Sequence, residues 1–398
     1  MSLAQPRLNS LGPYPFERLS KLLADSVPDS RLDHIDAGAG EPRLPPPEFT
    51  REVLLENIGG FSRYPPTRGS QILRESICRW LQRRYGLKYI DAETQVLSAN
   101  GTREALYSVA HALIDPEADP KPYVLMPNPM YQIYLGAAVI AGARPFFLTC
   151  GPEHHFEPRL EDVPDEVWDR TAMVYVCSPS NPTGWIADRN YYAGLLQRAD
   201  HYDFVVCADE CYSEIYWNEP PAGLLQIAEQ LGRKDYGRCL VFNSLSKRSA
   251  LPGMRSGFIA GDASLIGQFA RLRSYAGPAT PLPLQMLAAH AWEDETHVVT
   301  NRQCFRQSLQ AFDEVYSQGS ATCTIPAGGF FIWLAVENGE AFAVAAYEQQ
   351  SVTILPGKYL AADDPSGSNP GEGFVRIALV DGPEKAAELA SRLKKIRL

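Results

Sequence analysis

The sequence predicts an α/β fold in which a large domain, with a mainly parallel β-sheet sandwiched by helices, is joined to a smaller α+β domain. Three observations predict this fold. The chain has 398 residues, a length that corresponds to roughly two or three domains. In its middle, short apolar runs alternate with segments of helical spacing, the pattern of parallel strands connected by helices. After about residue 285 the alternation ends, and a long helical segment precedes a group of strands.

The large domain is expected over residues 48–283. Its strands are predicted by five short runs that are rich in β-formers and bounded by Gly, Pro, Asn or Asp. These runs are Tyr123–Met126, Ala172–Cys177, Phe204–Ala208, Cys239–Phe242 and Gly257–Ala260. They lack polar alternation, which indicates strands buried on both faces of the sheet. Helical spacing over Tyr191–Tyr202 supplies one of the covering helices.

The smaller domain is expected to combine residues 1–47 with residues 284–398. A helical stretch over Leu284–Gln318 leads to three strands and a final helix that starts at Pro383. The strands are Phe330–Val336, Val352–Leu355 and Val375–Leu379. The proline-rich segment up to about Pro47 is expected to have no sheet of its own and to pack on this domain.

Composition excludes several classes of partner. The chain is 45% hydrophobic and 21% charged, as packed domains are, and its formal net charge is −10. An acidic chain has no electrostatic footprint for nucleic acid or anionic lipid, so neither is an expected partner. The uncharged stretch over residues 122–143 reaches membrane-spanning length, but Pro127-Asn128-Pro129 interrupts it. A strand, a turn and a buried helix are therefore expected there instead of a membrane span.

The eight cysteines show no C-x-x-C spacing, so no zinc or redox site is expected. Several lie inside apolar runs, where free thiols behave as small hydrophobic residues. Residues 1–23 lack an apolar core long enough for a secretory signal. We therefore expect reduced thiols and a cytoplasmic protein. The pair His154-His155 has no other ligand nearby in sequence and is expected at the surface, not at a metal.

Four segments with reactive or polar side chains come at the ends of predicted strands, where α/β sheets bind their ligands. The first, residues 178–184, reads S-P-S-N-P-T-G and holds Asn181 in a rigid turn; an ordinary turn explains it equally well. The second places Asp209 and Tyr212 three residues apart after a strand. These side chains can orient a heteroaromatic ring, but a helix N-cap followed by a core tyrosine is the alternative.

The third segment contains Ser244, Ser246 and Lys247. A lysine flanked by hydroxyls after a buried strand is poorly explained as a surface charge, and it predicts a Schiff-base lysine with a lowered pKa. The S-x-x-K spacing also occurs in serine acyl-transferring enzymes. Those enzymes need S-D-N and K-T-G as well, and this sequence has neither.

The fourth segment places Arg376 inside an apolar strand. A buried guanidinium needs an anionic partner, either a bound carboxylate or an internal ion pair. Near the start of the large domain, Asn100-Gly101-Thr102 opens a helical run over Arg103–Ile114. The backbone N–H groups of a helix N-terminus form a site for phosphate.

Together these segments resemble the fold-type-I, pyridoxal-5'-phosphate-dependent aminotransferases of the aspartate aminotransferase class. The motifs S-P-x-N-P-T-G, D-E-x-Y, S-x-S-K and P-G-x-R-x-G occur in the family's order, and the resemblance runs from about Leu11 to the C-terminus. It implies that Lys247 carries the cofactor, that Asp209 pairs with the pyridine nitrogen, and that Asn181 and Tyr212 contact the ring hydroxyl.

The same resemblance implies the other cofactor and substrate contacts. The phosphate would be held by Ser244, Arg255 and the amides of Gly101 and Thr102, with Ser246 nearby. Tyr131 would stack on the ring. Arg376 would bind the substrate α-carboxylate, helped by Asn181 and the backbone of Gly40. Tyr64 would reach the phosphate bound by a second subunit, which implies a homodimer with shared active sites.

The implied substrates are small amino and keto acids. Segments 13–19, 128–134 and 244–249 are similar to the members of this class that transfer the amino group of N-succinyl-diaminopimelate to 2-oxoglutarate. A donor with a distal carboxylate needs a second cation, and Arg18, Arg43 and Arg248 are the candidates. The segment Gly40-Glu41-Pro42-Arg43 departs from the class pattern. In the class an acidic residue more often follows the proline, whereas here the acidic residue, Glu41, precedes it. The alternatives are another donor (acetylornithine, aspartate or aromatic), a carbon–sulfur β-lyase, and a non-catalytic cofactor-binding regulator.

Overall fold

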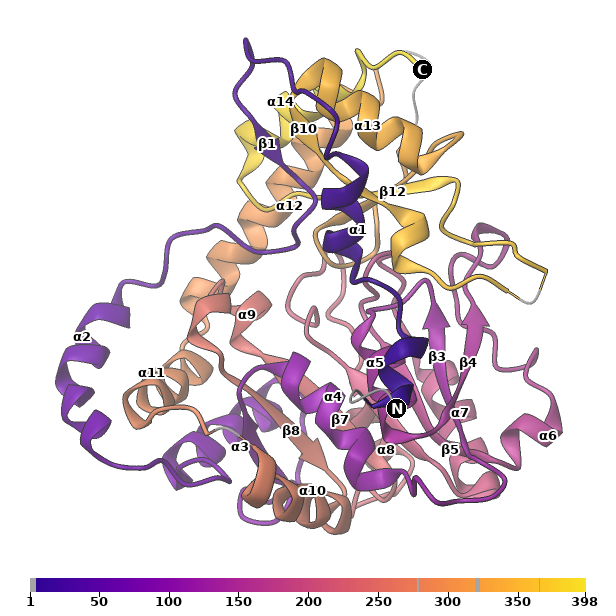
Figure 1. The fold of residues 1–398 in the computed structure, drawn as a ribbon. Helices are drawn as coiled ribbons and strands as arrows, with labels where there is room; N and C mark the ends of the chain where they lie inside the picture. The colour runs from indigo at the N-terminus through magenta and orange to yellow at the C-terminus, as the bar shows by residue number, and fades with distance from the viewer. Residues whose placement is uncertain (1–4, 278, 319–322, 365) are drawn as a thin grey trace.

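A computed structural model describes residues 5–277, 279–318, 323–364 and 366–398. Its main feature is a seven-stranded sheet with the strand order β2-β8-β7-β6-β5-β3-β4 (Figure 1). Only β8 runs antiparallel to its neighbours, so the sheet is mainly parallel, as predicted. The strands are β2 (Val96–Ala99), β3 (Tyr123–Asn128), β4 (Arg144–Thr149), β5 (Thr171–Cys177), β6 (Val205–Asp209), β7 (Cys239–Ser244) and β8 (Gly257–Gly261).

Helices cover both faces of this sheet because its strands are apolar on both sides. In β5, Val174 and Val176 join one core, whereas Met173, Tyr175 and Cys177 join the other. The first core includes residues of α3 (Gln71–Tyr85), α7 (Arg189–Tyr202), α8 (Leu224–Gln230) and α11 (Leu282–Glu293). The second includes residues of α4 (Thr102–Leu113), α5 (Ile133–Ala141) and α10 (Ala263–Ala276). The expected sandwich of helices around a buried sheet is therefore confirmed.

A smaller, three-stranded sheet has the order β11-β12-β9. It consists of β9 (Phe331–Ala335), β11 (Leu355–Pro356) and β12 (Phe374–Ala378), and packs with α12 (Thr296–Tyr316), α13 (Gly339–Gln350) and α14 (Pro383–Leu393) around a third core. Figure 1 shows α12 running from the side of the large sheet up to α14 in the smaller part. None of the described helices is both long and apolar enough to cross a membrane.

Three expectations about the smaller part were wrong in detail. The helical stretch over residues 284–318 is two helices, α11 and α12, because Asp294 adopts an extended conformation between them. The strand expected over Val352–Leu355 is divided between two sheets: β10 (Val352–Thr353) and β11. The N-terminal segment does form a strand, β1 (Ile35–Asp36), which pairs parallel with β10. The boundaries proposed at residues 47/48 and 283/284 stay predictions, although α11 contributes Leu287 and Trp292 to a core of the large sheet.

Short elements complete the chain. The remaining α-helices are α1 (Pro15–Leu22), α2 (Phe49–Asn57), α6 (Asp165–Trp168) and the single turn α9 (Leu245–Arg248). The 3-10 helices are η1 (Pro6–Ser10), η2 (Ile58–Ser62), η3 (Pro152–His154), η4 (Pro252–Met254) and η5 (Gly357–Leu360). The N-terminal segment crosses from the large sheet to the smaller part and back, so it borders the space between them (Figure 1).

Candidate active site

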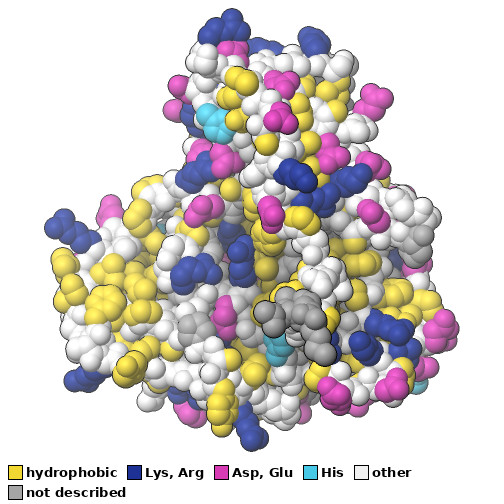
Figure 2. All heavy atoms as spheres, in the orientation of Figure 1, with side chains coloured by type: hydrophobic (Ala, Val, Ile, Leu, Met, Phe, Trp, Pro, Cys, Tyr) yellow, Lys and Arg dark blue, Asp and Glu magenta, His cyan; other side chains and the backbone are white. Residues whose placement is uncertain are grey.

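A cavity of about 490 Å³ lies at the carboxyl ends of β5, β6 and β7, between the large sheet, the smaller sheet and the N-terminal segment. Figure 2 shows the molecule hollowed between its upper and lower parts, with basic and acidic side chains around the hollow. Most of the predicted site residues line this cavity: Gly40, Thr102, Tyr131, Asn181, Asp209, Tyr212, Ser244, Ser246, Lys247, Arg255 and Arg376. The fold thus brings together residues that are more than 300 positions apart in the sequence.

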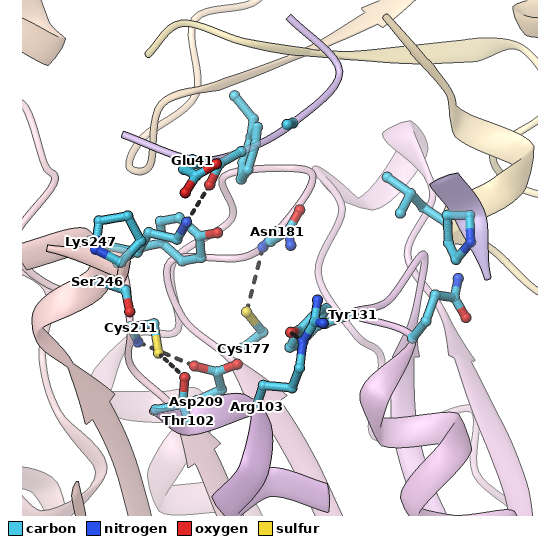
Figure 3. A pocket seen from close by; sticks show the side chains of 18 of the residues that line it. Glu41, Thr102, Arg103, Tyr131, Cys177, Asn181, Asp209, Cys211, Ser246 and Lys247 are labelled. Carbon is cyan, nitrogen blue, oxygen red and sulfur yellow. Dashed lines mark hydrogen bonds between the residues drawn. The ribbon is translucent and has the colours of Figure 1, made fainter. Parts of the chain in front are cut away.

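Lys247 reaches into the cavity from the single helical turn α9 (Figure 3). Its ammonium group donates a hydrogen bond to the carbonyl of Gly40 on the N-terminal segment. Burial, with the nearby Arg376 adding to it, lowers the pKa of Lys247 to about 8, since a charged amine is poorly solvated there. More of the neutral, nucleophilic amine is therefore present near neutral pH than for an ordinary lysine.

Asp209 ends β6 and lies at the floor of the cavity, almost fully buried. Its carboxylate accepts hydrogen bonds from the Tyr134 hydroxyl at 2.7 Å and from the Cys211 amide at 3.2 Å. Burial raises the pKa of Asp209, and these hydrogen bonds act against that rise. A cationic ring nitrogen beside this carboxylate would stabilise its charged form.

Groups suited to a phosphate gather at the N-terminus of α4. Gly101 adopts φ +81°, and a Cβ atom added to it would overlap the Arg255 guanidinium, so glycine is required for this close approach. Arg255 donates to the carbonyls of Asn100 and Pro252 and has no carboxylate partner among the described residues. Ser244 and Ser246 line the same end of the cavity, and the Thr102 hydroxyl lies 3.0 Å from the Cys211 sulfur. Gly101 itself does not line the cavity but starts the helix that does.

Arg376 enters from β12 of the smaller sheet, with only 5% of its surface exposed. It donates to Asn181 Oδ1 at 3.0 Å and to the carbonyl of Gly38 at 2.7 Å, while its Nε atom has no partner among the described residues. Burial lowers the pKa of Arg376 to about 10. No internal ion pair with a described residue neutralises this guanidinium, so the arrangement suits a bound carboxylate.

Tyr131 and two residues that the sequence did not single out form another wall. Arg103 donates from Nε to the Tyr131 hydroxyl at 2.9 Å and from Nη2 to the Tyr14 hydroxyl at 3.0 Å. Burial raises the pKa of Tyr131 to about 12, so this phenol stays protonated. Arg103 directly follows Thr102 at the predicted helix N-terminus, which is a signal that could have identified it. Tyr14 offered no comparable signal, because its contact depends on how the N-terminal segment folds back.

Several expected contacts do not form in one chain. Tyr64 is fully exposed and does not line the cavity. The three arginines proposed for a distal carboxylate also lie outside its lining. Arg43 pairs with Asp36 and Asp381, Arg18 lies over the Tyr359 ring at 3.9 Å, and Arg248 is buried against Glu295.

The arrangement fits pyridoxal phosphate. A half-buried lysine with a lowered pKa, a buried carboxylate and a helix N-terminus beside an arginine without a described carboxylate partner are grouped in one cavity, and a second arginine is left for a substrate carboxylate. When bound, this cofactor supplies a ring that withdraws electrons from the substrate α-carbon. All four groups come from different elements, α9, β6, α4 and β12, so only the complete fold assembles them.

Comparison with known proteins agrees with this reading. Residues 33–393 match the family described as aminotransferase class I and II. The chain belongs to this family, and it is a pyridoxal-phosphate-dependent aminotransferase of fold type I.

Individual relatives and solved structures are similar to this chain over nearly its whole length. The chain is 28% identical to an LL-diaminopimelate aminotransferase of Maridesulfovibrio salexigens, over 98% of both chains. An aminotransferase structure from Neisseria meningitidis superposes with a TM-score of 0.91 at 37% identity, covering 98% of this chain and 99% of that one. A probable N-succinyldiaminopimelate aminotransferase from Thermus thermophilus shares the fold, with a TM-score of 0.84 at 24% identity over 96% and 99% of the chains.

Proposed function

We propose that this enzyme transfers an amino group between N-succinyl-LL-2,6-diaminopimelate and 2-oxoglutarate, with glutamate on the other side, in lysine biosynthesis. Names of relatives support a diaminopimelate-type substrate, since two relatives at 28% identity are named LL-diaminopimelate aminotransferases. The succinyl group distinguishes the two donors. The far end of the succinylated compound carries two carboxylates, whereas the far end of LL-diaminopimelate carries one carboxylate and one ammonium group.

Within this proposal Lys247 holds the cofactor and then moves the proton at the substrate α-carbon. Asp209 keeps the ring nitrogen protonated, and Asn181 and Tyr212 contact the ring hydroxyl. The phosphate is assigned to Ser244, Ser246, Arg255 and the amides of Gly101 and Thr102, and Tyr131 stacks on the ring. These roles are supported by the placement of the side chains around one cavity.

Arg376 is assigned to the α-carboxylate, together with Asn181 and the backbone of Gly40. Two parallel hydrogen bonds from a guanidinium fix the orientation of a carboxylate. Holding the substrate in this way directs the bond to be broken, and such orientation can be worth several kcal/mol of the barrier.

The observation that carries the donor proposal is Arg103. Its guanidinium lines the cavity, is tethered by the Tyr14 and Tyr131 hydroxyls, and has no carboxylate partner among the described residues. A cation held by two neutral hydroxyls keeps its full charge for a ligand. Burial, acting alone, would lower the pKa of Arg103, but its contacts with the tyrosines raise it overall, so it stays protonated. We therefore assign the distal carboxylate of the donor and of 2-oxoglutarate to Arg103.

One observation favours the rival donor, LL-diaminopimelate. Glu41 also lines the cavity, and it has no basic partner among the described ion pairs. A carboxylate there would attract the distal ammonium group of LL-diaminopimelate and repel a succinyl carboxylate. Arg103 thus favours the succinylated donor, whereas Glu41 favours LL-diaminopimelate, and the experiment distinguishes between the two donors.

The experiment compares donors in wild-type enzyme and in two variants, with 2-oxoglutarate as acceptor. We expect N-succinyl-LL-diaminopimelate to have the highest kcat/KM among that compound, LL-diaminopimelate, acetylornithine, aspartate and an aromatic amino acid. Arg103→Gln should lower kcat/KM for the succinylated donor about 10- to 150-fold, the range of a hydrogen bond to a charged group. The aromatic donor, which lacks a distal carboxylate, should change about twofold or less.

Arg18→Gln is the matched control, because Arg18 packs on the Tyr359 ring outside the cavity lining. It should leave the donor ranking unchanged. If LL-diaminopimelate is the better donor and Glu41→Gln selectively lowers its kcat/KM, the succinylated substrate is wrong and LL-diaminopimelate replaces it. If aspartate or an aromatic donor outperforms both, the diaminopimelate assignment fails and the aminotransferase assignment stands.

We also propose that the enzyme acts as a homodimer with shared active sites. Large apolar side chains are exposed on α2, η2 and the following turn: Leu55, Ile58, Phe61 and Tyr64. Figure 2 shows hydrophobic side chains gathered over this region at the left of the molecule. Exposed patches of this kind mark interaction sites. A second copy that covers the patch would bring Tyr64 to the cofactor phosphate held by its neighbour.

The eight free cysteines support a reducing, cytoplasmic setting for the enzyme.

A further inference from the structure

The helical turn that carries Lys247 has two faces with different environments. Ser246 and Lys247 line the cavity, whereas Leu245, Arg248 and Ser249 are buried on the opposite side. As a single turn, α9 ends with a backbone hydrogen bond from the Ser249 amide to the Leu245 carbonyl at 3.0 Å. Such a turn has little stiffness of its own. The position of Lys247 therefore depends on what holds the buried face.

Arg248 holds that face to the end of α11. Its guanidinium donates to the carbonyl of Ala291 at 2.6 Å, to that of Trp292 at 3.5 Å and to that of Asp294 at 3.3 Å. These carbonyls belong to the last turn of a helix and the residue after it, where no intrahelical donor is available. Arg248 also pairs with Glu295 at 2.9 Å. The buried guanidinium of Arg248 thus caps the C-terminal end of α11, just before α12 begins.

Ser249 holds the same face to the start of α12. Its hydroxyl lies 2.8 Å from His297 Nε2, and His297 Nδ1 lies 2.5 Å from Asp294 Oδ1. The Asp294 carboxylate also accepts from the His297 amide at 3.1 Å, which caps the first turn of α12. Arg248 Nη1 donates to the Ser249 hydroxyl at 3.2 Å.

The donors and acceptors in this chain are consistent with a neutral imidazole. Arg248 donates to Ser249, the Ser249 hydroxyl donates to His297 Nε2, and His297 Nδ1–H donates to the Asp294 carboxylate. The residue types are those of a serine nucleophile triad, but Ser249 has no exposed surface, so no substrate reaches its hydroxyl. This series of hydrogen bonds is therefore suited to holding α9 against α12 and not to attacking a substrate.

The junction between α11 and α12 matters because of where the two helices go. The first helix packs in a core of the large sheet, whereas α12 packs against α14 and the smaller sheet, which carries Arg376. The two backbone ends meet at Asp294 and Glu295, beside α9. Any change in the direction of α12 is therefore transmitted to the residues next to Lys247.

We propose that Arg248, Ser249, His297 and Asp294 are positioning residues that lock the α11–α12 junction onto α9 and thereby set the place of Lys247 relative to Arg376. The inference rests on the proposed role of Lys247 as the cofactor lysine. It predicts that breaking the hydrogen-bond chain shifts the lysine within the cavity without touching cofactor or substrate directly.

The test compares His297→Leu, which removes both ring hydrogen bonds, with His297→Gln, whose amide can donate to Asp294 and accept from Ser249. Ser249→Ala removes only the shared hydroxyl. The matched control is His290→Asn, because His290 is exposed on α11 and contacts the same Phe49 ring as His297. Three quantities are measured: the pH midpoint of the visible band of the bound cofactor, kcat and KM separately, and the unfolding temperature of the cofactor-free protein.

His297→Leu and Ser249→Ala are expected to move the pH midpoint of the band by about half a unit or more and to lower kcat about 10- to 100-fold, the cost of a misplacement of about 1 Å. KM should change about threefold or less. His297→Gln should restore most of the wild-type values, and His290→Asn should match wild type.

A lower unfolding temperature with an unchanged midpoint and unchanged kcat would show a purely structural role and overturn the inference. If His297→Leu does not fold, Ser249→Ala decides by the same criteria. Lys247→Ala separates this inference from the proposed function. A Lys247→Ala protein that keeps the wild-type band refutes the role of Lys247, whereas loss of the band there with wild-type behaviour in Ser249→Ala refutes only the positioning role.

Discussion

At the scale of single residues, the cavity is defined by cations that lack carboxylate partners among the described residues. Arg376 is satisfied in part by Asn181 and a carbonyl, and Arg255 by two carbonyls. Both thus keep their charge available for an anion. For Asp209, the helix N-cap alternative is wrong, because no helix begins directly after β6: one oxygen accepts from the Cys211 amide in a turn, and the other accepts from the Tyr134 hydroxyl. Both carboxylate oxygens of Asp209 lie at the cavity floor, where they would face the ring nitrogen of the bound cofactor.

The lowered pKa of Lys247 predicts the pH dependence of cofactor capture. If Lys247 holds the cofactor as proposed, its neutral amine would be the reactive form, so capture of the cofactor by the cofactor-free protein should speed up as pH rises through about 8 and level off above it. An unperturbed lysine would level off only near pH 10.5. Stopped-flow absorbance at the cofactor band measures this rate. A rate still rising tenfold per pH unit above pH 9.5 would contradict the buried position of Lys247.

Replacement of Asp209 tests the floor of the cavity. Asp209→Ala should keep much of the fold but lower kcat by roughly 100- to 1,000-fold or more, because the charge that stabilises the protonated ring nitrogen is gone. Steady-state rates together with near-ultraviolet circular dichroism measure both properties. Tyr134→Phe serves as the comparison, since it removes the hydroxyl bonded to Asp209 and leaves the carboxylate. A near-normal kcat in Asp209→Ala would reject the role.

At the scale of elements, the large sheet explains why the site lies where it does. Strands β5, β6 and β7 are parallel, so Cys177, Asp209 and Ser244 end at one edge of the sheet. The polar residues that follow each strand therefore meet there. Beside them, the break between α11 and α12 at Asp294 places the half-buried His297 next to the helical turn of Lys247.

His297 makes stability depend on pH. Burial lowers the pKa of His297 below its ordinary value of 6.5, with Arg248 adding to this and Asp294 and Glu295 opposing it. The unfolded chain then binds the proton more readily, so this contribution to stability is present above pH 6.5 and is lost as pH falls below it. The free energy of unfolding should fall by at most about 1.4 kcal/mol per pH unit from this one group.

Urea unfolding of the cofactor-free protein between pH 5 and 8 measures this dependence. His297→Gln should lack the part that is due to the imidazole, so the difference between the two proteins should shrink or reverse as the pH falls. Glu210 is expected to act in the opposite direction in both proteins, because burial raises its pKa to about 7 and its stabilising contribution is lost on raising the pH. Parallel pH curves for wild type and His297→Gln would contradict the prediction.

At the scale of the whole molecule, the cavity wall is shared by distant parts of the chain. The N-terminal segment supplies Tyr14 and Gly40, the large sheet supplies Asp209, the helical turn α9 supplies Lys247, and the smaller sheet supplies Arg376. Tyr64 remains fully exposed, which is unusual for a large aromatic side chain and leaves it free to contact a second copy.

Mixing two inactive variants tests the shared site. Tyr64→Ala and Lys247→Ala should each be inactive or nearly so, and together they should recover up to about a quarter of wild-type activity, because half the dimers are mixed and each has one intact site. Activity after subunit exchange, with exchange verified by mass spectrometry, measures the recovery. Tyr89→Ala in place of Tyr64→Ala is a control, since Tyr89 is also exposed. No recovery despite verified exchange would count against a shared site.

The sequence by itself determined the class of fold and the local chemistry. Apolar runs without polar alternation predicted the central strands, and the residues that follow or interrupt these runs predicted Lys247, Asp209 and Arg376 as cavity residues. Local signals suffice here because a strand end and its following turn are contiguous in the chain. The same rules missed β2 and β4: Val96–Ala99 is only four residues long, and Arg144–Thr149 is exposed at both ends.

Only the tertiary structure decided the contacts between segments that are distant in sequence. The interval from Asn181 to Arg376 spans 195 positions, and that from Gly40 to Lys247 spans 207. The spacing of hydrophobic residues in the sequence does not indicate which of several arginines lines a given cavity. Arg103 lines the cavity, whereas Arg18, Arg43 and Arg248 lie outside its lining, and Arg248 instead caps the end of α11. The physical reason is that burial and pairing are properties of the packed chain, because each depends on which side chains exclude water from a charge.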